Sequence, residues 1–393
     1  MLARARQLAD ELVRLRRDIH QHPELGFQEF RTAALVADTL AEIGLEVRTG
    51  VGRTGVVGQI GTGDGPTIAI RADMDALPIQ EQRGDKPYCS ENEGVMHACG
   101  HDAHTATLLG VAHLLKQSFA GGQWQGNVRL LFQPSEETFG DEGFSGATAM
   151  IDDGALEGVD AVIALHVDST HPAGEVRFQD GPSLAAVDSF EAWLYGSGGH
   201  GAYPHQGSDP IYMLGSILNG IYAIPSRRID PLQNCLISIG QVSGGAAPNV
   251  IPGEVYMQGT IRSHSQETRE RLWAELERVL SLSEWLGGRY KLTLYRGYPV
   301  LYNDPEVNDW LRQVTREVVG ETAVIESQFG MGAEDFAYMA ERAKGAMFML
   351  GAALPDDLLR NHHTDIFDID ERVMPVGVAI LAETAVRFVT GGL

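Results

Sequence analysis

Short runs of apolar residues recur along the chain and have the length of buried strands. Four of them are Thr67–Ile70, Val128–Phe132, Ala161–Leu165 and Ala346–Leu350. Their continuous apolar character predicts strands covered on both faces, as in a parallel sheet. Helical periodicity appears between these runs, over Thr32–Ile43, Ala103–Phe119 and Val307–Val319. This alternation predicts an α/β fold with a mostly parallel sheet and helices on both faces.

The middle of the chain has a different pattern. The segments SFEAWLYGS (from Ser189), CLISIGQVSGG and VYMQGTIRS alternate apolar and polar residues, as strands with one exposed face do. The segment that begins at Ser265, SQETRERLWAELERVLSL, is strongly amphipathic and starts with a residue that caps helices well. We therefore expect a smaller α+β domain over residues 184–297. It is inserted into the α/β domain, which is formed by residues 1–183 and 298–393.

Charge and cysteine usage narrow the class of protein. The chain of 393 residues carries 53 acidic against 30 basic residues, a net charge of −23. A basic surface is missing, so we expect neither nucleic acid nor an anionic membrane as a partner. Its three cysteines are too few for a disulfide framework, which favours a cytoplasmic protein. No stretch approaches the ~20 consecutive apolar residues of a membrane span.

Polar side chains directly follow three of the predicted strands. They are Asp73 and Asp75 after the first strand, Glu136 and Glu137 after the second, and His166 after the third. The carboxyl ends of parallel strands share one edge of a sheet, so these side chains should converge there with Cys99 and His101. Thiolate, imidazole and carboxylate are the ligands of zinc and similar ions, whereas thiolate disfavours magnesium and calcium.

Two of these groups have an alternative interpretation. Cys99 in MHACGHDAHTA could be a small buried apolar residue, although His101 beside it favours a metal ligand, with Gly100 allowing a tight turn. Glu136 and Glu137 could be solvated glutamates at a loop start. On an extended segment, however, neighbouring side chains point to opposite sides, so one could ligate a metal while the other acts as a base.

Several motifs resemble one known family in order and spacing. They are HQHPELGFQE, RADMDALP, MHACGHDAHTA, FQPSEE, GVDAVIALHV, GSGGHGAYPHQGSDPI, GGAAPNVIPGEV, GTIRS, GAEDFAYM and HHTDIFDIDE. They resemble the hippurate hydrolase/N-acyl-L-amino-acid amidohydrolase family, which belongs to the di-metal aminoacylases and carboxypeptidases. The resemblance implies a catalytic α/β domain with two divalent ions and an inserted lid that also forms a homodimer or homotetramer. Zinc fits the ligands first, with manganese, cobalt and nickel as alternatives.

The resemblance also implies a role for each ligand. Cys99 resembles the ligand that bridges both metals. His101 and His166 resemble the other ligands of one metal, and Glu137 and His363 those of the second. His362 is also a candidate, but the family's spacing of four residues before the aromatic, here Phe367, selects His363.

The remaining site residues follow from the same resemblance. Glu136 resembles the general base, and Asp75 or Asp102 would orient a ligand histidine. His200 resembles a lid residue that polarises the scissile carbonyl, reaching the site of the partner subunit. Asn249 and Arg262 resemble lid groups that hold the carboxylate of the substrate.

The expected activity is hydrolysis of an N-acyl-L-amino acid or a related small amide conjugate, by metal-activated water with Glu136 as the base. A dipeptidase or carboxypeptidase on the same metal site is the alternative enzyme, and a non-catalytic metal-binding protein is the alternative from another class. Two segments depart from the family: TFGDEGFSGA after Glu137, with Asp141 and Glu142, and VDSTHP after His166. In the second, Asp168 is either a solvated loop residue or a group that favours cationic substrates.

Overall fold

The computed structural model describes residues 1–84, 86–140 and 143–393, which form two compact units. Unit 1 consists of Met1–Gly181, Tyr302–Phe329 and Tyr338–Leu393, and unit 2 of Pro182–Leu301 and Gly330–Ala337. The short strands β7 (Gly181–Leu184) and β14 (Leu301–Asn303) and helix α10 (Phe336–Ala340) contain crossings between them. Unit 2 thus includes residues 330–337, which the sequence pattern had assigned to the α/β domain.

Unit 1 is built on one eight-stranded mixed sheet in the order β1-β2-β4-β3-β5-β16-β6-β15. The four central strands β4, β3, β5 and β16 run parallel, while β1, β2 and β6 pair antiparallel with their neighbours β2, β4 and β16. Strand bounds are β1 Glu46–Val51, β2 Gly55–Gly61, β3 Thr67–Asp73, β4 Asn127–Gln133, β5 Ala161–Pro172, β6 Val176–Phe178, β15 Val324–Glu326 and β16 Lys344–Ala353. The four predicted strands are these four central ones.

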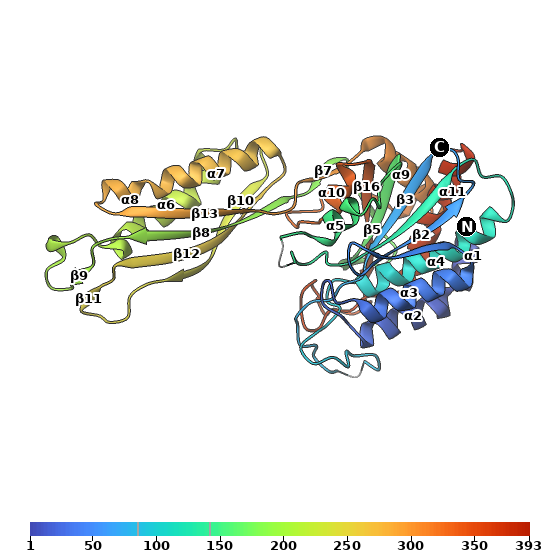
Figure 1. Cartoon of the computed structure of the whole chain (residues 1–393), viewed down its shortest axis with the longest axis horizontal. Helices are drawn as coiled ribbons and strands as arrows, with labels where there is room; N and C mark the ends of the chain where they lie inside the picture. The colour runs from blue at the N-terminus through green and yellow to red at the C-terminus, as the bar shows by residue number, and fades with distance from the viewer. Residues whose placement is uncertain (85, 141–142) are drawn as a thin grey trace. The chain divides into compact units, whose positions relative to one another are not determined.

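Helices cover both faces of this sheet (Figure 1). Their bounds are α1 Leu2–Gln7, α2 Ala9–Gln21, α3 Phe30–Ile43, α4 His101–Phe119, α5 Gly146–Asp152, α9 Pro305–Val318 and α11 Met374–Thr390, with 3₁₀ turns at Glu321–Ala323 and Glu371–Val373. Alternate residues of β4, including Leu130 and Phe132, join the core beneath α4 and α11. Arg129, directly before Leu130, faces the other side, where it donates to the carbonyls of Ala155 and Glu157 beyond α5.

Helix α11 explains one failure of the sequence analysis. Within the part of the chain that the structure describes, residues Glu371–Thr390 are long and apolar enough to cross a membrane. Most of this stretch is buried inside the fold, however, and α11 lies between α4 and α9. Its apolar character is that of a helix in the centre of a core.

Unit 2 has a four-stranded antiparallel sheet in the order β10-β12-β8-β13. Its elements are β8 Ala186–Tyr195, β9 Gly199–His200, β10 Cys235–Ser243, β11 Val250–Ile251, β12 Glu254–Ser263, β13 Arg289–Arg296, α6 Pro210–Arg227, α7 Gln266–Leu280 and α8 Leu282–Trp285, with a 3₁₀ turn at Pro204–Gln206. The hydroxyl of Ser265 accepts from the amide of Thr268, which confirms the predicted cap of α7. Helices α6 and α7 close a separate apolar core on one face of the sheet.

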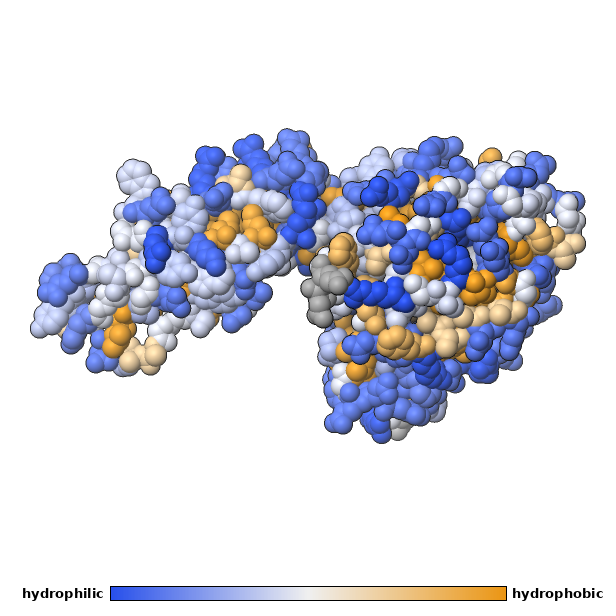
Figure 2. Space-filling model, viewed as in Figure 1, coloured by the Kyte–Doolittle hydropathy of each residue, from blue (hydrophilic) through white to orange (hydrophobic). Residues whose placement is uncertain are grey.

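The visible surface of both units is mainly hydrophilic, with apolar residues in scattered patches (Figure 2). This distribution agrees with the large excess of acidic residues.

Candidate metal centre

The candidate ligands of unit 1 converge at the carboxyl edge of its parallel strands. Asp73 ends β3, Glu136 and Glu137 follow β4, His166 lies within β5, Cys99 and His101 lie at the start of α4, and His362 and His363 follow β16. The sequence pattern ended the β5 strand at Leu165, but the strand continues to Pro172. His166 is therefore held by the sheet itself, since it pairs with Met349 of β16.

A left-handed turn joins Cys99 to His101. Gly100 has φ +94°, and a Cβ atom there would lie 2.3 Å from Cγ2 of Val167. Only glycine meets both conditions at low cost, because a side chain would be strained and would also clash. The turn lets two residues that are too close for a regular helix both present ligand atoms at the mouth of α4.

Asp75 fixes the orientation of His101. The Nδ1 atom of His101 lies 3.1 Å from Oδ1 of Asp75 and 2.9 Å from its carbonyl oxygen. The other carboxylate oxygen of Asp75 accepts from the amide of Glu137 at 3.0 Å. One carboxylate thus positions two candidate ligands, and it turns Nδ1 of His101 toward an oxygen, so that Nε2 is the atom that would face a metal.

Two buried atoms at this point have no hydrogen-bond partner among the described residues: Nε2 of His101 and Oε1 of Glu137. Nε2 of His363 lies 3.0 Å from this Oε1, within ion-pair distance. Burying such atoms unpaired is costly. A bound cation would satisfy both atoms, so the residues present fit a metal site.

The electrostatics of the cluster also favour cations. Burial acts to lower the pKa of His101, but the carboxylates of Asp73, Asp75 and Glu137 outweigh it and raise this pKa to about 10. Burial, followed by the charges of Glu137, Glu136 and Asp73, raises the pKa of the Cys99 thiol well above its usual value. Both pKa shifts arise in part from the negative charges of the surrounding carboxylates. Divalent ions bound at the cluster would neutralise these charges.

The ligand atoms form overlapping groups. One contains Cys99, Glu137 and His363, and another contains His101, Glu136 and Glu137, each with its atoms within 4.8 Å of one another. A third contains Cys99, His166 and His362. Cys99 is shared by two of them, as a bridging ligand would be. Glu136 is 6% exposed, so it lies beside the ligands and away from bulk water.

His104 is also close to the ligands, but its nitrogens are occupied. Its Nδ1 lies 2.7 Å from Oδ1 of Asp73, and its Nε2 accepts from the amide of Val167 at 2.9 Å. It therefore joins the end of β3 to β5 next to His166 and has no lone pair left for a metal. Its position three residues after His101 on one helix face was the available signal.

Asp102 does not orient a ligand histidine, which corrects one of the two possibilities predicted for it. Its carboxylate is fully buried and binds Nε of Arg16 at 3.0 Å and Nδ1 of His20 at 2.7 Å. These partners lie on α2, more than 80 residues earlier in the chain. The orienting carboxylate is that of Asp75.

Asp168 is neither solvated nor available to a cationic substrate. Its carboxylate binds Nη1 of Arg177 at 2.6 Å and lies 2.9 Å from Nδ1 of His171. Burial opposes ionisation, but the hydrogen bonds from Thr170 and then the charge of His171 hold the pKa of Asp168 at about 2. The other two acidic residues noted beside the ligands, Asp141 and Glu142, lie outside the described residues.

In unit 2, two of the three predicted substrate groups lie together. His200 in β9 pairs with Val250 in β11, and the amide of Gly201 donates to the carbonyl of Asn249 at 2.8 Å. Arg262 lies near the opposite end of β12, eight residues beyond Glu254. At ~3.3 Å per residue, this separation is about 26 Å. Asn249 precedes the Glu254 end of β12, so within one copy of unit 2 it lies toward the other end of this strand from Arg262.

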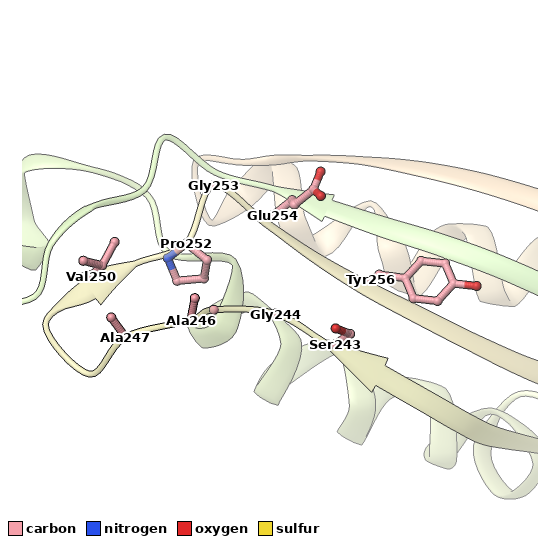
Figure 3. Close-up of a pocket in the computed structure, with 10 residues that line it drawn as sticks. Ser243, Gly244, Ala246, Ala247, Val250, Pro252, Gly253, Glu254 and Tyr256 are labelled. Carbon is pink, nitrogen blue, oxygen red and sulfur yellow. The ribbon is translucent and has the colours of Figure 1, made fainter.

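A cavity of about 490 Å³ lies beside strand β11 in unit 2 (Figure 3). Its lining is Ser243, Gly244, Gly245, Ala246, Ala247, Val250, Pro252, Gly253, Glu254 and Tyr256. Glu254 is the one ionisable carboxylate of this lining, and none of the candidate ligands belongs to it. The candidate metal ligands therefore lie in unit 1 and not beside this cavity.

Known proteins resemble this chain in sequence and in structure. The sequence pattern of Peptidase family M20/M25/M40 matches residues 69–387. Thermostable carboxypeptidase 1 of Saccharolobus solfataricus is 40% identical over 98% of this chain and 96% of its own length. N-acetyl-L-cysteine deacetylase of Bacillus subtilis is 38% identical over 97% and 88%. The solved structure of the Bacillus subtilis YxeP protein, described as a dinuclear metal binding peptidase, superposes with a TM-score of 0.84 at 32% identity, covering 98% of this chain and 99% of that one.

Proposed function

Since the chain belongs to Peptidase family M20/M25/M40 and is a metal-dependent amide or peptide hydrolase, we propose that its substrates are N-acyl-L-amino acids or related small amide conjugates. The observation that carries the proposal is the position of Glu136, a buried carboxylate beside His101 and Glu137 in the ligand cluster. The deacetylase relative supports an acyl substrate, and the carboxypeptidase relative supports the peptidase alternative.

The residues divide the chemistry among them. Cys99, His101, His166, Glu137 and His363 would hold two divalent ions, which supply an acidified water and a polarised carbonyl when bound. Glu136 takes the proton of the attacking water and returns it to the leaving amine. Its burial excludes bulk water, which would otherwise compete for that proton.

Arg262 lies toward one end of β12, whereas His200 and Asn249 lie at the paired strands β9 and β11. This separation suggests that two copies of the chain build one substrate site. Arg262 of one copy grips the carboxylate of the substrate, because its planar guanidinium matches a carboxylate. His200 of the second copy reaches the scissile carbonyl, and Asn249 of that copy joins Arg262 on the carboxylate. An isologous dimer through unit 2 would supply both contributions to both sites.

Amine release from matched pairs of substrates tests the reaction. Enzyme reconstituted with zinc, manganese or cobalt is assayed on N-acetyl-, N-benzoyl- and indoleacyl-amino acids and on the dipeptides with the same C-terminal residue. We expect the N-acyl compounds to be cleaved faster. Faster cleavage of the dipeptides would establish the peptidase alternative, and no cleavage by fully metallated protein would favour a metal-binding protein without catalysis.

The base is tested by Glu136→Gln, which keeps the size of the side chain and removes its basicity. We expect kcat to fall by roughly 10²–10⁴-fold, the usual contribution of a positioned base, while the metal content stays at the wild-type value. A metal content that falls with the activity would show that Glu136 is a ligand instead.

Mixing two inactive variants tests the shared site. His200→Ala and Glu136→Gln proteins are unfolded together and refolded, so that mixed dimers form. If His200 acts across the interface, one site of each mixed dimer is intact and activity returns. If His200 acts within its own chain, every site lacks one group and the mixture stays inactive.

A further inference from the structure

Two adjacent histidines, His362 and His363, both lie close to Cys99. Side chains of neighbouring residues on an extended strand point apart. Here His363 has φ +62°, a left-handed conformation that is uncommon for a residue with a side chain. Its amide donates to the carbonyl of Ala98 at 2.8 Å, which fixes the segment beside Cys99. As a result, Nδ1 of His362 lies 3.7 Å from Sγ of Cys99, while His363 faces Glu137.

The hydrogen bond at Nε2 of His362 shows which ring nitrogen carries the proton. The amide of Ser169 in β5 donates to Nε2 of His362 at 3.4 Å. A neutral imidazole carries a single N–H, so a ring that accepts at Nε2 carries its proton on Nδ1. That proton points at the sulfur of Cys99. The ring is held in this orientation between His166 and Phe367, with centroid distances of 5.3 and 5.1 Å.

The histidines that fit as ligands turn Nδ1 toward an oxygen and not toward the sulfur. Nδ1 of His166 lies 2.7 Å from the carbonyl of Val167, and Nδ1 of His101 contacts Asp75. When a metal is bound, both rings would therefore carry their single proton on Nδ1, toward an oxygen, and offer the lone pair of Nε2 to the ion. Nε2 of His166 lies 3.5 Å from Sγ of Cys99. His166 and His362 thus approach the same sulfur with different atoms, one a lone pair and the other an N–H.

We propose that His362 donates a hydrogen bond to the Cys99 thiolate and is not a metal ligand. It is a positioning residue: it holds one lone pair of the sulfur and withdraws electron density from it, while the other lone pairs face the ions. A thiolate with such a donor is a weaker electron donor and is oxidised less readily. The inference rests on the two-metal site of the proposed function, but not on its substrate.

Cobalt spectroscopy of the reconstituted full chain tests this role. His362→Asn keeps an N–H near the position of Nδ1, and His362→Leu has a similar size without a donor. We expect both variants to bind two cobalt ions per chain. The sulfur-to-cobalt charge-transfer band should move to lower energy in His362→Leu and stay near the wild-type position in His362→Asn. Inactivation by peroxide should be faster in His362→Leu alone.

His166→Leu is the control for loss of a ligand, and it should bind less cobalt. Loss of cobalt from both His362 variants, as in this control, would make His362 a ligand and overturn the inference. An unchanged band in His362→Leu would also overturn it. Absence of the band from the wild type would refute both the inference and the proposed role of Cys99. The expected band shift in an enzyme that cleaves no N-acyl compound would support the inference and reject only the substrate.

Discussion

At the scale of single residues, Glu29 shows how a carboxyl group outside the ligand set supports the site. Its Oε1 accepts from the amides of Ser135 at 2.8 Å and Phe27 at 3.0 Å, and its Oε2 accepts from the hydroxyl of Thr54 at 2.5 Å. Ser135, directly before Glu136, is held at φ +42°. Burial and then the charge of Asp75 raise the pKa of Glu29 to about 7. Glu29 therefore keeps its proton in mildly acidic solution and is about half ionised near pH 7, and it fixes the turn that carries the proposed base.

This raised pKa makes a prediction for the metal-free protein. The pKa of Glu29 is higher in the folded state, about 7, than its ordinary value of 4.5. Its contribution to stability is thus complete below pH 4.5 and is lost as the pH rises through 7. Glu29→Gln keeps the acceptor oxygen and cannot ionise. Relative to the wild type, we expect the variant to gain up to about 3 kcal/mol in free energy of unfolding between pH 5 and 8. Urea titrations at each pH measure the difference, and a constant difference would contradict the assignment.

At the scale of elements, one buried cation joins three segments of unit 1. Arg16 of α2 is fully buried, and it binds Asp102 in the first turn of α4 at 3.0 Å. It also binds Asp368, five residues after His363, at 2.8 Å and Glu371 at 3.0 Å. The same guanidinium therefore fixes the helix that begins with His101 and the segment that carries His363.

A pair of variants on α2 isolates this effect. Arg16→Met leaves buried carboxylates without their cation, so we expect a loss of about 3–5 kcal/mol in free energy of unfolding. Arg14→Met on the same helix removes an exposed pair with Glu11 and should cost below about 1 kcal/mol. Denaturant unfolding of the metal-free proteins compares them. Equal losses would mean that the buried network contributes no more than the surface pair does.

The elements themselves were largely predictable from the sequence, because their patterns are local. The apolar runs of β3, β4 and β16 and the periodicity of α4 and α7 each lie within one segment. The positions of Glu137 after a strand and of Cys99 before a helix made the metal cluster predictable as well. The partner of Asp102 was not predictable, since Arg16 lies 86 residues away. The φ angle of His363, which decides where His362 points, was not predictable from any residue pattern either.

At the scale of the whole molecule, the two units have separate apolar cores. One core contains residues of α4, α11 and the large sheet, and the other contains residues of α6, α7 and the smaller sheet. All five candidate ligands are in unit 1. Metal binding therefore adds its free energy to one of the two units.

Calorimetry with and without a chelator tests this division. At a free metal concentration a thousand times Kd, binding stabilises the folded state by about 4 kcal/mol. We expect EDTA to lower the midpoint of the transition of unit 1 and to leave that of unit 2 unchanged. The continuous part of unit 2, residues 182–301, is expressed alone to identify the transition of that unit. A single transition that shifts as a whole would show that the units unfold together.

The discontinuity of unit 1 also has a consequence for synthesis on the ribosome. Residues 182–301 emerge as one continuous stretch with a core of their own, whereas the large sheet lacks its central strand β16 until residue 353 has left the exit tunnel. At 5–20 residues per second, a translating chain spends roughly ten seconds or more with Cys99, His101 and His166 exposed before His363 arrives. The order of the chain thus makes metal loading a late event in biogenesis, and the nascent thiol depends on the reducing power of its surroundings until then.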